Sequence, residues 1–391
     1  MKKLLATLLV LALALGMLTA CGSTEIHSYT EDNAAAEEED LFANALTAYA
    51  PDTKVAEVNG FAVYWNEYAY WLAYIGSQIA YPDENGKIDW NAAEGSEEPL
   101  GETLRAAVQD SIVQYHILES MAADAGIEFD DAGTEYVENI IKNAIVSVLG
   151  EEGTEEDLDE YLKDYYLDMD VLRYQGRIEY LYTKLFELKF GAHGEKVGDQ
   201  EIEAYLAEHA LMKAKHILYS FTDDEGNELD DTAKAAQLEK AQAAVKQLRE
   251  IKETDKLVEK FDEIMNAESQ DPGLAYYPDG YVFGTGEMMQ EFEDGVLALG
   301  DYEVSDPVET TAGYHVILRL PVTGDTVVSK DSDGSDITVR YQAAMQAFNE
   351  LANAEVENAD VQWEQGFENL DLNKVFASSG GGFFSKLFGK K

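Results

Sequence analysis

Two short apolar runs constrain the second half of this 391-residue chain more than any other feature. Residues 212–220 read "MKAKHILYS" and residues 313–320 read "GYHVILRL", so each has the length and composition of a buried strand. Each run also contains a histidine, His216 in the first and His315 in the second. Because side chains alternate between the two faces of a strand, we expect the two rings to meet if the strands are neighbours.

The segments between these runs predict a small domain of mixed secondary structure. Helical patterns cover residues 232–251, 255–269 and 286–299, and a further strand is expected at 304–311. A loop that contains Pro272 and Pro278 separates the second helix from the third. We place this domain at residues 209–322.

A longer helical region precedes this domain, and a shorter one follows it. Residues 54–208 begin with a hairpin signal around Asn59-Gly60 and then show amphipathic helical periods, which need one another for burial. Residues 323–378 include one more helix, which has no partner near it in sequence. We expect this segment to pack back on the first helical domain, so that the strand-containing domain is an insertion. The predicted fold class is therefore α+β.

The first residues predict export. Residues 1–20 contain two lysines near the start, followed by an apolar stretch that is too short for a permanent membrane span. This pattern is typical of a signal peptide. The stretch ends in "LTAC", which resembles the lipobox of bacterial lipoproteins and would make Cys21 the lipid-bearing residue. The alternative is an ordinary signal peptide that happens to contain a cysteine. A lipobox predicts an extracytoplasmic protein, anchored by lipid to the outer face of the bacterial cell membrane.

Two polar segments flank the predicted domains. Residues 21–53 lack a steady apolar period and are expected to form an acidic tether. Residues 379–391 combine a glycine run with aromatic side chains and three lysines, and they are expected to form a flexible basic tail. Two interpretations of this tail stay open: it contacts an anionic membrane, or it is simply disordered.

Charge and cysteine content exclude several functions. The chain has a net charge of −49, and 26 basic against 77 acidic side chains remain once residues 1–20 are removed. Nucleic acid is an unsuitable partner for such a chain, because phosphate binding depends on Lys and Arg. The single cysteine excludes an intrachain disulfide and a cysteine metal site. With 46% hydrophobic residues the chain is nonetheless expected to be globular.

Three other features have ordinary interpretations that we prefer. His116 lies within a helical repeat, where a histidine is more often structural than catalytic. The acidic stretches "TDDEGNELDD" and "KDSDGSDI" lack the full ligand pattern of a calcium loop and are better explained as solvated turns. The aromatic run "YWNEYAYWLAY" at residues 64–74 fits a helix core, although some of its rings alternatively line a groove for unfolded polypeptide.

Residues 212–320 resemble the parvulin-type peptidyl-prolyl cis-trans isomerases. The resemblance rests on four blocks in order, "KAKHIL", "AESQDPG", "GEMMQEFEDGVLAL" and "VSDPVETTAGYHVILRL". The flanking helices, "VAEVNGFAVY" and the lipobox are similar to the PrsA and SurA type of extracytoplasmic foldase. This resemblance implies a mostly helical chaperone domain with an inserted domain in which helices flank a small antiparallel sheet.

The resemblance also implies a set of site residues. His216 and His315 would be adjacent on the central strands, Asp271 takes the position where the family has Cys or Asp, and Thr310 matches a threonine of the histidine network. The segment "YPDGYVF" departs from the family pattern and puts Gly280 where a pocket leucine is usual. Neither a metal nor a cofactor is implied. The residues that match the family's apolar pocket for the substrate proline are Met288, Phe292 and Phe283.

These observations predict a membrane-anchored foldase that binds unfolded secreted proteins and isomerises their X-Pro bonds. Its partners would be proline-containing polypeptides and, through the lipid on Cys21, the membrane. The main alternative is a non-enzymatic holdase whose degenerate parvulin domain only binds peptides. A solute-binding lipoprotein is a third possibility, but it requires repeated strand-helix units that the helical first half lacks.

Overall fold

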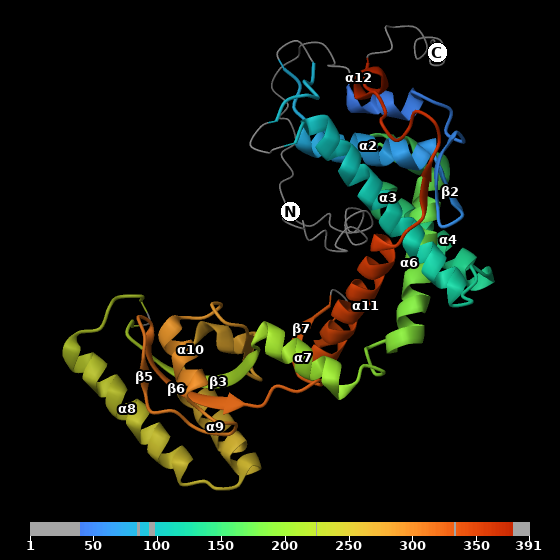
Figure 1. The fold of residues 1–391 in the computed structure, drawn as a ribbon. Helices are drawn as coiled ribbons and strands as arrows, with labels where there is room; N and C mark the ends of the chain where they lie inside the picture. Colours follow the sequence, from blue (N-terminus) through green and yellow to red (C-terminus); the bar gives the residue numbers. More distant parts are fainter. Residues whose placement is uncertain (1–39, 84–86, 94–97, 224, 332–333, 378–391) are drawn as a thin grey trace. The chain divides into compact units, whose positions relative to one another are not determined.

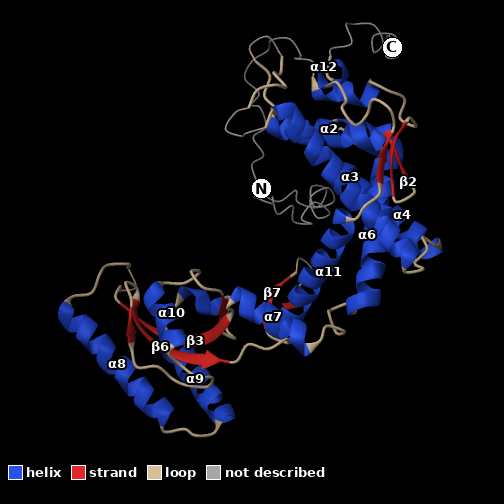
Figure 2. Cartoon of the chain, viewed as in Figure 1, coloured by secondary structure: helices blue, strands red, loops and turns tan. Residues whose placement is uncertain are grey.

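A computed structural model of the chain describes residues 40–83, 87–93, 98–223, 225–331 and 334–377. The described residues divide into two compact units, a helical unit (up to residue 189 and from residue 348 on) and a sheet unit (residues 190–347). Figure 1 shows the course of the chain and Figure 2 its helices and strands. The predicted α+β class, with a small antiparallel sheet inserted in a mostly helical chain, is confirmed. Within the described part of the chain, no helix has both the length and the apolar character needed to cross a membrane.

The helical unit begins with a short sheet against which its first helices pack. Strands β1 (Lys54–Val58) and β2 (Phe61–Tyr64) form the predicted hairpin, and β9 (Val361–Trp363) pairs antiparallel with β1 from the far end of the sequence. The turn requires positive φ at both central residues, which Asn59 (48°) and Gly60 (88°) adopt. The hairpin thus places the start of the next helix beside the C-terminal segment.

The helices of this unit bury an aromatic core. They are α2 (Trp65–Ile79), α3 (Leu100–Asp124), α4 (Asp131–Leu149), α5 (Glu155–Lys163), α6 (Met169–Phe190) and α12 (Leu372–Val375). Trp65, Tyr68 and Trp71 are at most 2% exposed, so the preferred core interpretation of the aromatic run is confirmed for these rings. Phe348, on α11 (Val339–Glu357), lies against Tyr182 and Phe186 of α6, with ring centroids 4.9 and 5.9 Å away.

The structure differs from the expected tether at its C-terminal end. Residues Phe42–Thr47 form a 3-10 helix, η1, and Phe42 and Ala45 in it are buried. The Phe42 ring lies 5.5 Å from that of Phe376, and the indole of Trp65 donates a hydrogen bond to the carbonyl of Ala45. The buried side chains of Phe42 and Ala45 therefore anchor this segment to the helical unit, although the apolar residues of the segment follow neither a helical nor a strand period. Residues 1–39 and 378–391, which include Cys21 and the whole of the expected basic tail, lie outside the described residues.

The sheet unit is built on four antiparallel strands in the order β4-β3-β6-β5. The central pair is β3 (Met212–Ser220) and β6 (Gly313–Leu320), flanked by β4 (Tyr281–Phe283) and β5 (Val308–Glu309). Helices α8 (Asp231–Arg249) and α9 (Thr254–Glu268) cover one face of the sheet through a core that includes Ile217, Tyr219 and Phe261. The other face packs against α10 (Gln290–Leu297) through Phe283, Phe292 and Ile317.

Further elements of the sheet unit lie outside the expected bounds of 209–322. Helix α7 (Asp199–His209) precedes β3, and the hairpin of β7 (Val327–Lys330) and β8 (Asp336–Thr338) follows β6. His209 of α7 lies 3.0 Å from Gln346 of α11 by its Nε2 atom. The acidic stretch after β3 folds as a turn in which Asp223 accepts backbone hydrogen bonds from Glu225 and Asn227.

Candidate active site in the sheet unit

The antiparallel register brings the two strand histidines together. His216 of β3 pairs with Ile317 of β6, and His315 of β6 pairs with Leu218 of β3. The histidines are therefore diagonal neighbours on the face that α10 covers. Their Nδ1 atoms are 2.9 Å apart and the residues are 8% and 2% exposed.

Asp271 joins this pair from the turn that follows α9. It is the N-cap of the short 3-10 helix η2 (Pro272–Ala275), and its Oδ1 accepts a hydrogen bond from the Gly273 N–H at 3.1 Å. Its Oδ2 lies 3.2 Å from Nε2 of His216 and accepts the hydroxyl of Tyr281 at 2.7 Å. The cap geometry thus fixes the carboxylate while its second oxygen faces the histidine.

Thr310 closes the other end of the network. Its hydroxyl oxygen accepts the Ala312 N–H at 3.1 Å and lies 2.9 Å from Nε2 of His315. The carbonyl of Gly313 is 3.5 Å from the same hydroxyl. Thr310 is 5% exposed, so the network is closed to water on this side.

The network supports two arrangements of protons with the same heavy-atom positions. In the first, Thr310 donates to His315, His315 donates from Nδ1 to His216, and His216 donates from Nε2 to Asp271. In the second, a doubly protonated His216 donates to both neighbours, His315 donates from Nε2 to Thr310, and the threonine hydroxyl turns to the Gly313 carbonyl. His315 is neutral in both arrangements, and the second holds one more proton than the first.

The electrostatics favour an ionised aspartate beside a neutral His315. Burial raises the pKa of Asp271, but the hydrogen bonds from His216 and Tyr281 outweigh burial and lower this pKa to about 2. Burial and the neighbouring His216 lower the pKa of His315 to about 3. Burial and the hydrogen bond to Asp271 raise the pKa of the Tyr281 hydroxyl, which therefore remains a donor.

An apolar wall lies directly against the histidines. The Phe292 ring stands edge-on to both imidazoles, with centroids 5.2 Å from His216 and 5.4 Å from His315. Phe283 lies 5.9 Å from Phe292, and the partly buried Met288 packs against the same core cluster. The structure therefore brings all seven predicted polar and apolar residues of this site into one region.

Two residues of this region escaped the sequence analysis. Tyr281 faces His216, with ring centroids 5.5 Å apart, and reaches Asp271 through its hydroxyl. Glu293 is 1% exposed and accepts the backbone N–H groups of Gly286 and Met288, which fixes the loop that carries Met288. Strand alternation offered a signal for Tyr281, because it stands two residues before Phe283 and must share its face.

The departure at Gly280 has a backbone cause. Gly280 has φ of +91°, and a Cβ there would come within 2.7 Å of the Ala214 carbonyl oxygen. A leucine cannot occupy this position without moving strand β3. Tyr281 opposite Ala214 contributes the side chain that turns toward the site instead.

Comparisons with known proteins give matches for this domain and for most of the chain. Residues 216–320 match the model of the "PPIC-type PPIASE domain" family. The chain is 25% identical over 283 residues to the foldase protein PrsA of Halalkalibacterium halodurans, a match that covers 71% of this chain and 76% of that protein. It is 32% identical over 154 residues to PrsA of Geobacillus kaustophilus, covering 38% of this chain and 53% of that protein.

A solved structure of a PrsA protein is also among the similar proteins. The crystal structure of PrsA from Bacillus subtilis is 20% identical and covers 76% of this chain and 96% of its own, with a TM-score of 0.24. The family match over residues 216–320 coincides with the segment that holds the histidine network and most of the sheet. Residues 216–320 are therefore a parvulin-type peptidyl-prolyl isomerase domain, within a chain that is similar to the PrsA foldases.

Proposed function

We propose that this protein is a lipid-anchored extracytoplasmic foldase that holds unfolded secreted proteins and isomerises their X-Pro bonds at the histidine network. His216, Asp271, His315 and Thr310 would form the polar part of the site. Met288, Phe292 and Phe283 would hold the proline ring. The observation that carries this proposal is the contact of Phe292 with both imidazoles, because it puts an apolar surface beside a buried polar relay.

The chemistry requires no covalent step. Rotation about the peptide bond has a barrier of roughly 18–20 kcal/mol because it breaks amide resonance, and uncatalysed X-Pro exchange takes tens to hundreds of seconds. A catalyst must therefore favour the twisted amide over both planar forms. An apolar surface that removes water favours the less polar twisted amide, and the polar relay beside it would stabilise the altered charge of the carbonyl oxygen or nitrogen electrostatically.

Asp271 would act as an orienting group in this mechanism. Its two oxygens accept three hydrogen bonds, from His216, Tyr281 and Gly273, which leaves no oxygen aimed at a substrate as a nucleophile. Its ionised form stabilises the proton on Nε2 of His216 and so sets which ring nitrogen faces His315.

A protease-coupled assay on an X-Pro peptide tests the assignment of the site. We expect His315→Gln and Asp271→Asn to lower kcat/KM, whereas the exposed His193→Gln keeps the wild-type rate. Circular dichroism of each variant checks that the fold is retained. Unchanged rates in both folded site variants would refute the assignment, and peptide affinity without any acceleration by wild type would support a holdase that only binds.

The anchor is tested separately from the isomerase. Lipid attachment at Cys21 rests on the "LTAC" sequence at the end of the signal-like segment. Mass spectrometry of the mature N-terminus should find acylated Cys21, and Cys21→Ala should move the protein from the membrane fraction to the soluble extracellular fraction. An unmodified N-terminus after the signal would contradict the anchor and leave the isomerase assignment intact.

A further inference from the structure

The segment that departs from the family pattern, "YPDGYVF" at residues 277–283, carries two tyrosines beside the histidine network. The ring of Tyr281 faces His216, with centroids 5.5 Å apart. The ring of Tyr277 lies 4.8 Å from that of Tyr281. Because His216 is 8% exposed and Tyr277 is 52% exposed, the three rings connect the buried site with the surface of the domain.

A closed turn holds Tyr277 at this surface. The Gly280 N–H donates to the Tyr277 carbonyl at 3.0 Å, so residues 277–280 form a hydrogen-bonded β-turn. Pro278 occupies the second position of the turn, where its preset φ is favourable. The Tyr277 N–H donates to the Gly273 carbonyl at 3.0 Å, which ties the turn to η2. The backbone therefore fixes Tyr277 although half of its side chain is exposed.

Tyr281 is fixed at both ends of its side chain. Its backbone pairs with Ala214 of β3, and its hydroxyl donates to Oδ2 of Asp271 at 2.7 Å. A Cβ at Gly273 would clash with this hydroxyl, so the glycine provides the room that the hydroxyl occupies. Tyrosine rings that are already held in place offer a large contact area, and a ligand that packs on them costs little conformational entropy.

The position of this tyrosine pair distinguishes it from isolated exposed tyrosines, which are ordinary on protein surfaces. Phe292, the proposed support of the proline ring, and Tyr281 lie 5.2 and 5.5 Å from the same His216 ring. The Tyr277 ring is therefore within about 10 Å of His216, a distance that about three extended residues span. A polypeptide whose proline lies on Phe292 can thus bring a nearby side chain to the tyrosines.

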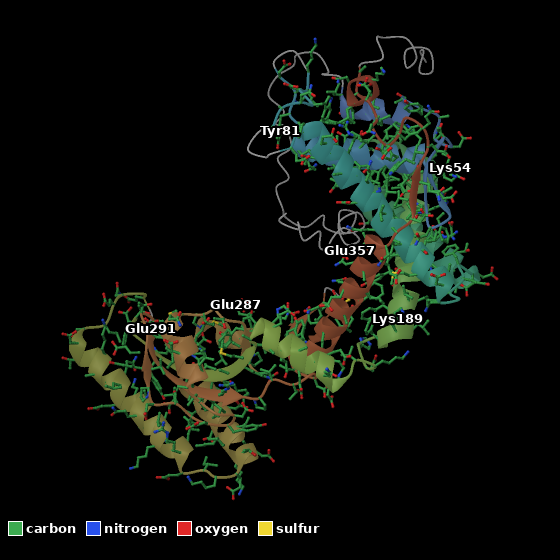
Figure 3. All side chains as sticks on the ribbon, viewed as in Figure 1. Lys54, Tyr81, Lys189, Glu287, Glu291 and Glu357 are labelled. Carbon is green, nitrogen blue, oxygen red and sulfur yellow. The ribbon has the colours of Figure 1, made fainter. Side chains whose placement is uncertain are left out.

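The charges around the pair disfavour an acidic side chain. Asp279 is exposed in the turn itself, and Asp271 lies beneath it as a carboxylate. Glu287, labelled in Figure 3, is exposed on the loop that leads to Met288, where it accepts the Gly284 N–H at 2.9 Å. These carboxylates would repel an anion, whereas the open tyrosine ring suits aromatic and aliphatic groups through stacked or edge-on contacts.

We propose that Tyr277 and Tyr281 form a specificity subsite that binds an aromatic or large aliphatic side chain of the substrate within three residues of its proline. The inference deepens the proposed function and rests on it, because it takes the proline ring to lie against Phe292. The segment that departs from the family pattern then determines which X-Pro sequences the domain isomerises most efficiently.

A positional scan of short peptides tests the subsite. Each peptide has a central proline in an alanine background and one phenylalanine, placed from three residues before the proline to three after it. NMR exchange spectroscopy with the full mature chain measures catalysed exchange without a coupled protease, which would itself cleave at aromatic residues. At one position or more, phenylalanine should raise kcat/KM about threefold to tenfold over the all-alanine peptide, the range of a single aromatic contact. Leucine should give part of this gain there, and glutamate none.

Matched variants separate the ring contact from the structure of the turn. Tyr277→Ala should bring the ratio of the phenylalanine to the alanine peptide close to one, with the loss in KM, because the contact is made equally in the ground and transition states. Tyr277→Phe keeps the ring and should retain the ratio. Tyr276→Ala changes the neighbouring side chain, which is 81% exposed, and should retain both the ratio and the rate. Circular dichroism checks the fold of each variant.

Four results have distinct consequences for these proposals. A flat scan with the wild type would overturn the subsite. A Tyr277→Ala variant that keeps the wild-type ratio, or that only lowers kcat on all peptides alike, would overturn it as well, because the tyrosine would then be merely structural. A lysine peptide that gains as much as the phenylalanine peptide would assign the selectivity to the carboxylates and overturn the aromatic subsite. Failure to accelerate any peptide would instead refute the proposed function itself.

Discussion

Replacement of Tyr281 by phenylalanine removes one hydroxyl from the isomerase site and nothing else. That hydroxyl donates to Oδ2 of Asp271 at 2.7 Å, the same oxygen that faces His216. A hydrogen bond to a charged group contributes about 1.5–3 kcal/mol, and the partial exposure of Tyr281 reduces the expected loss of stability to about 1 kcal/mol. For a domain of this size such a loss lowers Tm by about 2–4 °C.

The effect on activity should follow from the aspartate. Without the tyrosine hydroxyl the pKa of Asp271 should rise from about 2. The carboxylate would then be oriented toward His216 by the Gly273 N–H and no longer by Tyr281 as well. We expect kcat/KM to fall about threefold to tenfold, which is about 0.7–1.4 kcal/mol of transition-state stabilisation. The acid limb of the pH profile should move to higher pH, because the variant protonates Asp271 more readily than the wild type does.

The assay is isomerase activity on an X-Pro peptide between about pH 2 and 8, a range that reaches the low pKa of Asp271, with thermal unfolding measured on the same samples. Tyr276→Phe is the matched control, because Tyr276 is 81% exposed on the same loop and has no place in the network. A Tyr281→Phe variant with the wild-type rate and an unshifted acid limb would refute the argument that this hydroxyl positions Asp271.

Three further perturbations have clear outcomes. Gly280→Ala should lower the free energy of unfolding by about 1–3 kcal/mol, because it adds a clash with Ala214 to the strain of positive φ. Gly286→Ala is the control, since Gly286 has φ of +88° but open space around it, and its loss should be smaller. Equal losses in chemical denaturation would contradict this. His315→Gln should make stability depend less on pH in acid. In the wild type, the unfolded chain protonates His315 below its usual pKa of about 6.5, whereas the native protein protonates it only near pH 3. The free energy of unfolding of the wild type should therefore fall by about 1.4 kcal/mol per pH unit between these values. Parallel curves for variant and wild type would show that His315 is not held neutral. Phe348→Ala should destabilise the helical unit by about 3–5 kcal/mol, because its ring is fully buried between Tyr182 and Phe186, and an unchanged denaturation midpoint would refute that packing.

The sequence predicted the parts of the site that depend on local periodicity. His216 and His315 were readable because each interrupts a short apolar strand, and the antiparallel pairing of these strands makes them diagonal neighbours. The hairpin at Asn59-Gly60 was readable because its turn type demands those residues. Tyr281 was not predicted because its strand, β4, has only three residues, which is too short a run to show a clear alternation, although Tyr281 and Phe283 share a face.

Features that depend on distant contacts were beyond sequence reasoning. Strand β9 has three residues, and it exists because β1, some three hundred residues earlier, offers it an edge. The pairing of His116 with Glu67 forms only when α2 packs against α3, and no spacing within one helix reveals it, whereas Glu119 stands three residues after His116 on the same helix face. His116 is buried and paired with Glu67 in the structure, and this environment depends on the packing of two helices.

The central claim is that isomerisation takes place where Phe292 contacts the two histidines. Its most direct test is NMR exchange spectroscopy of a short X-Pro peptide with catalytic amounts of the mature chain, which reports cis-trans exchange without a coupled protease. Wild type and His193→Gln should bring exchange from tens of seconds to below about one second, whereas folded Phe292→Ala and Met288→Ala variants should slow it about tenfold or more. Exchange at the wild-type rate in both folded pocket variants would contradict the claim.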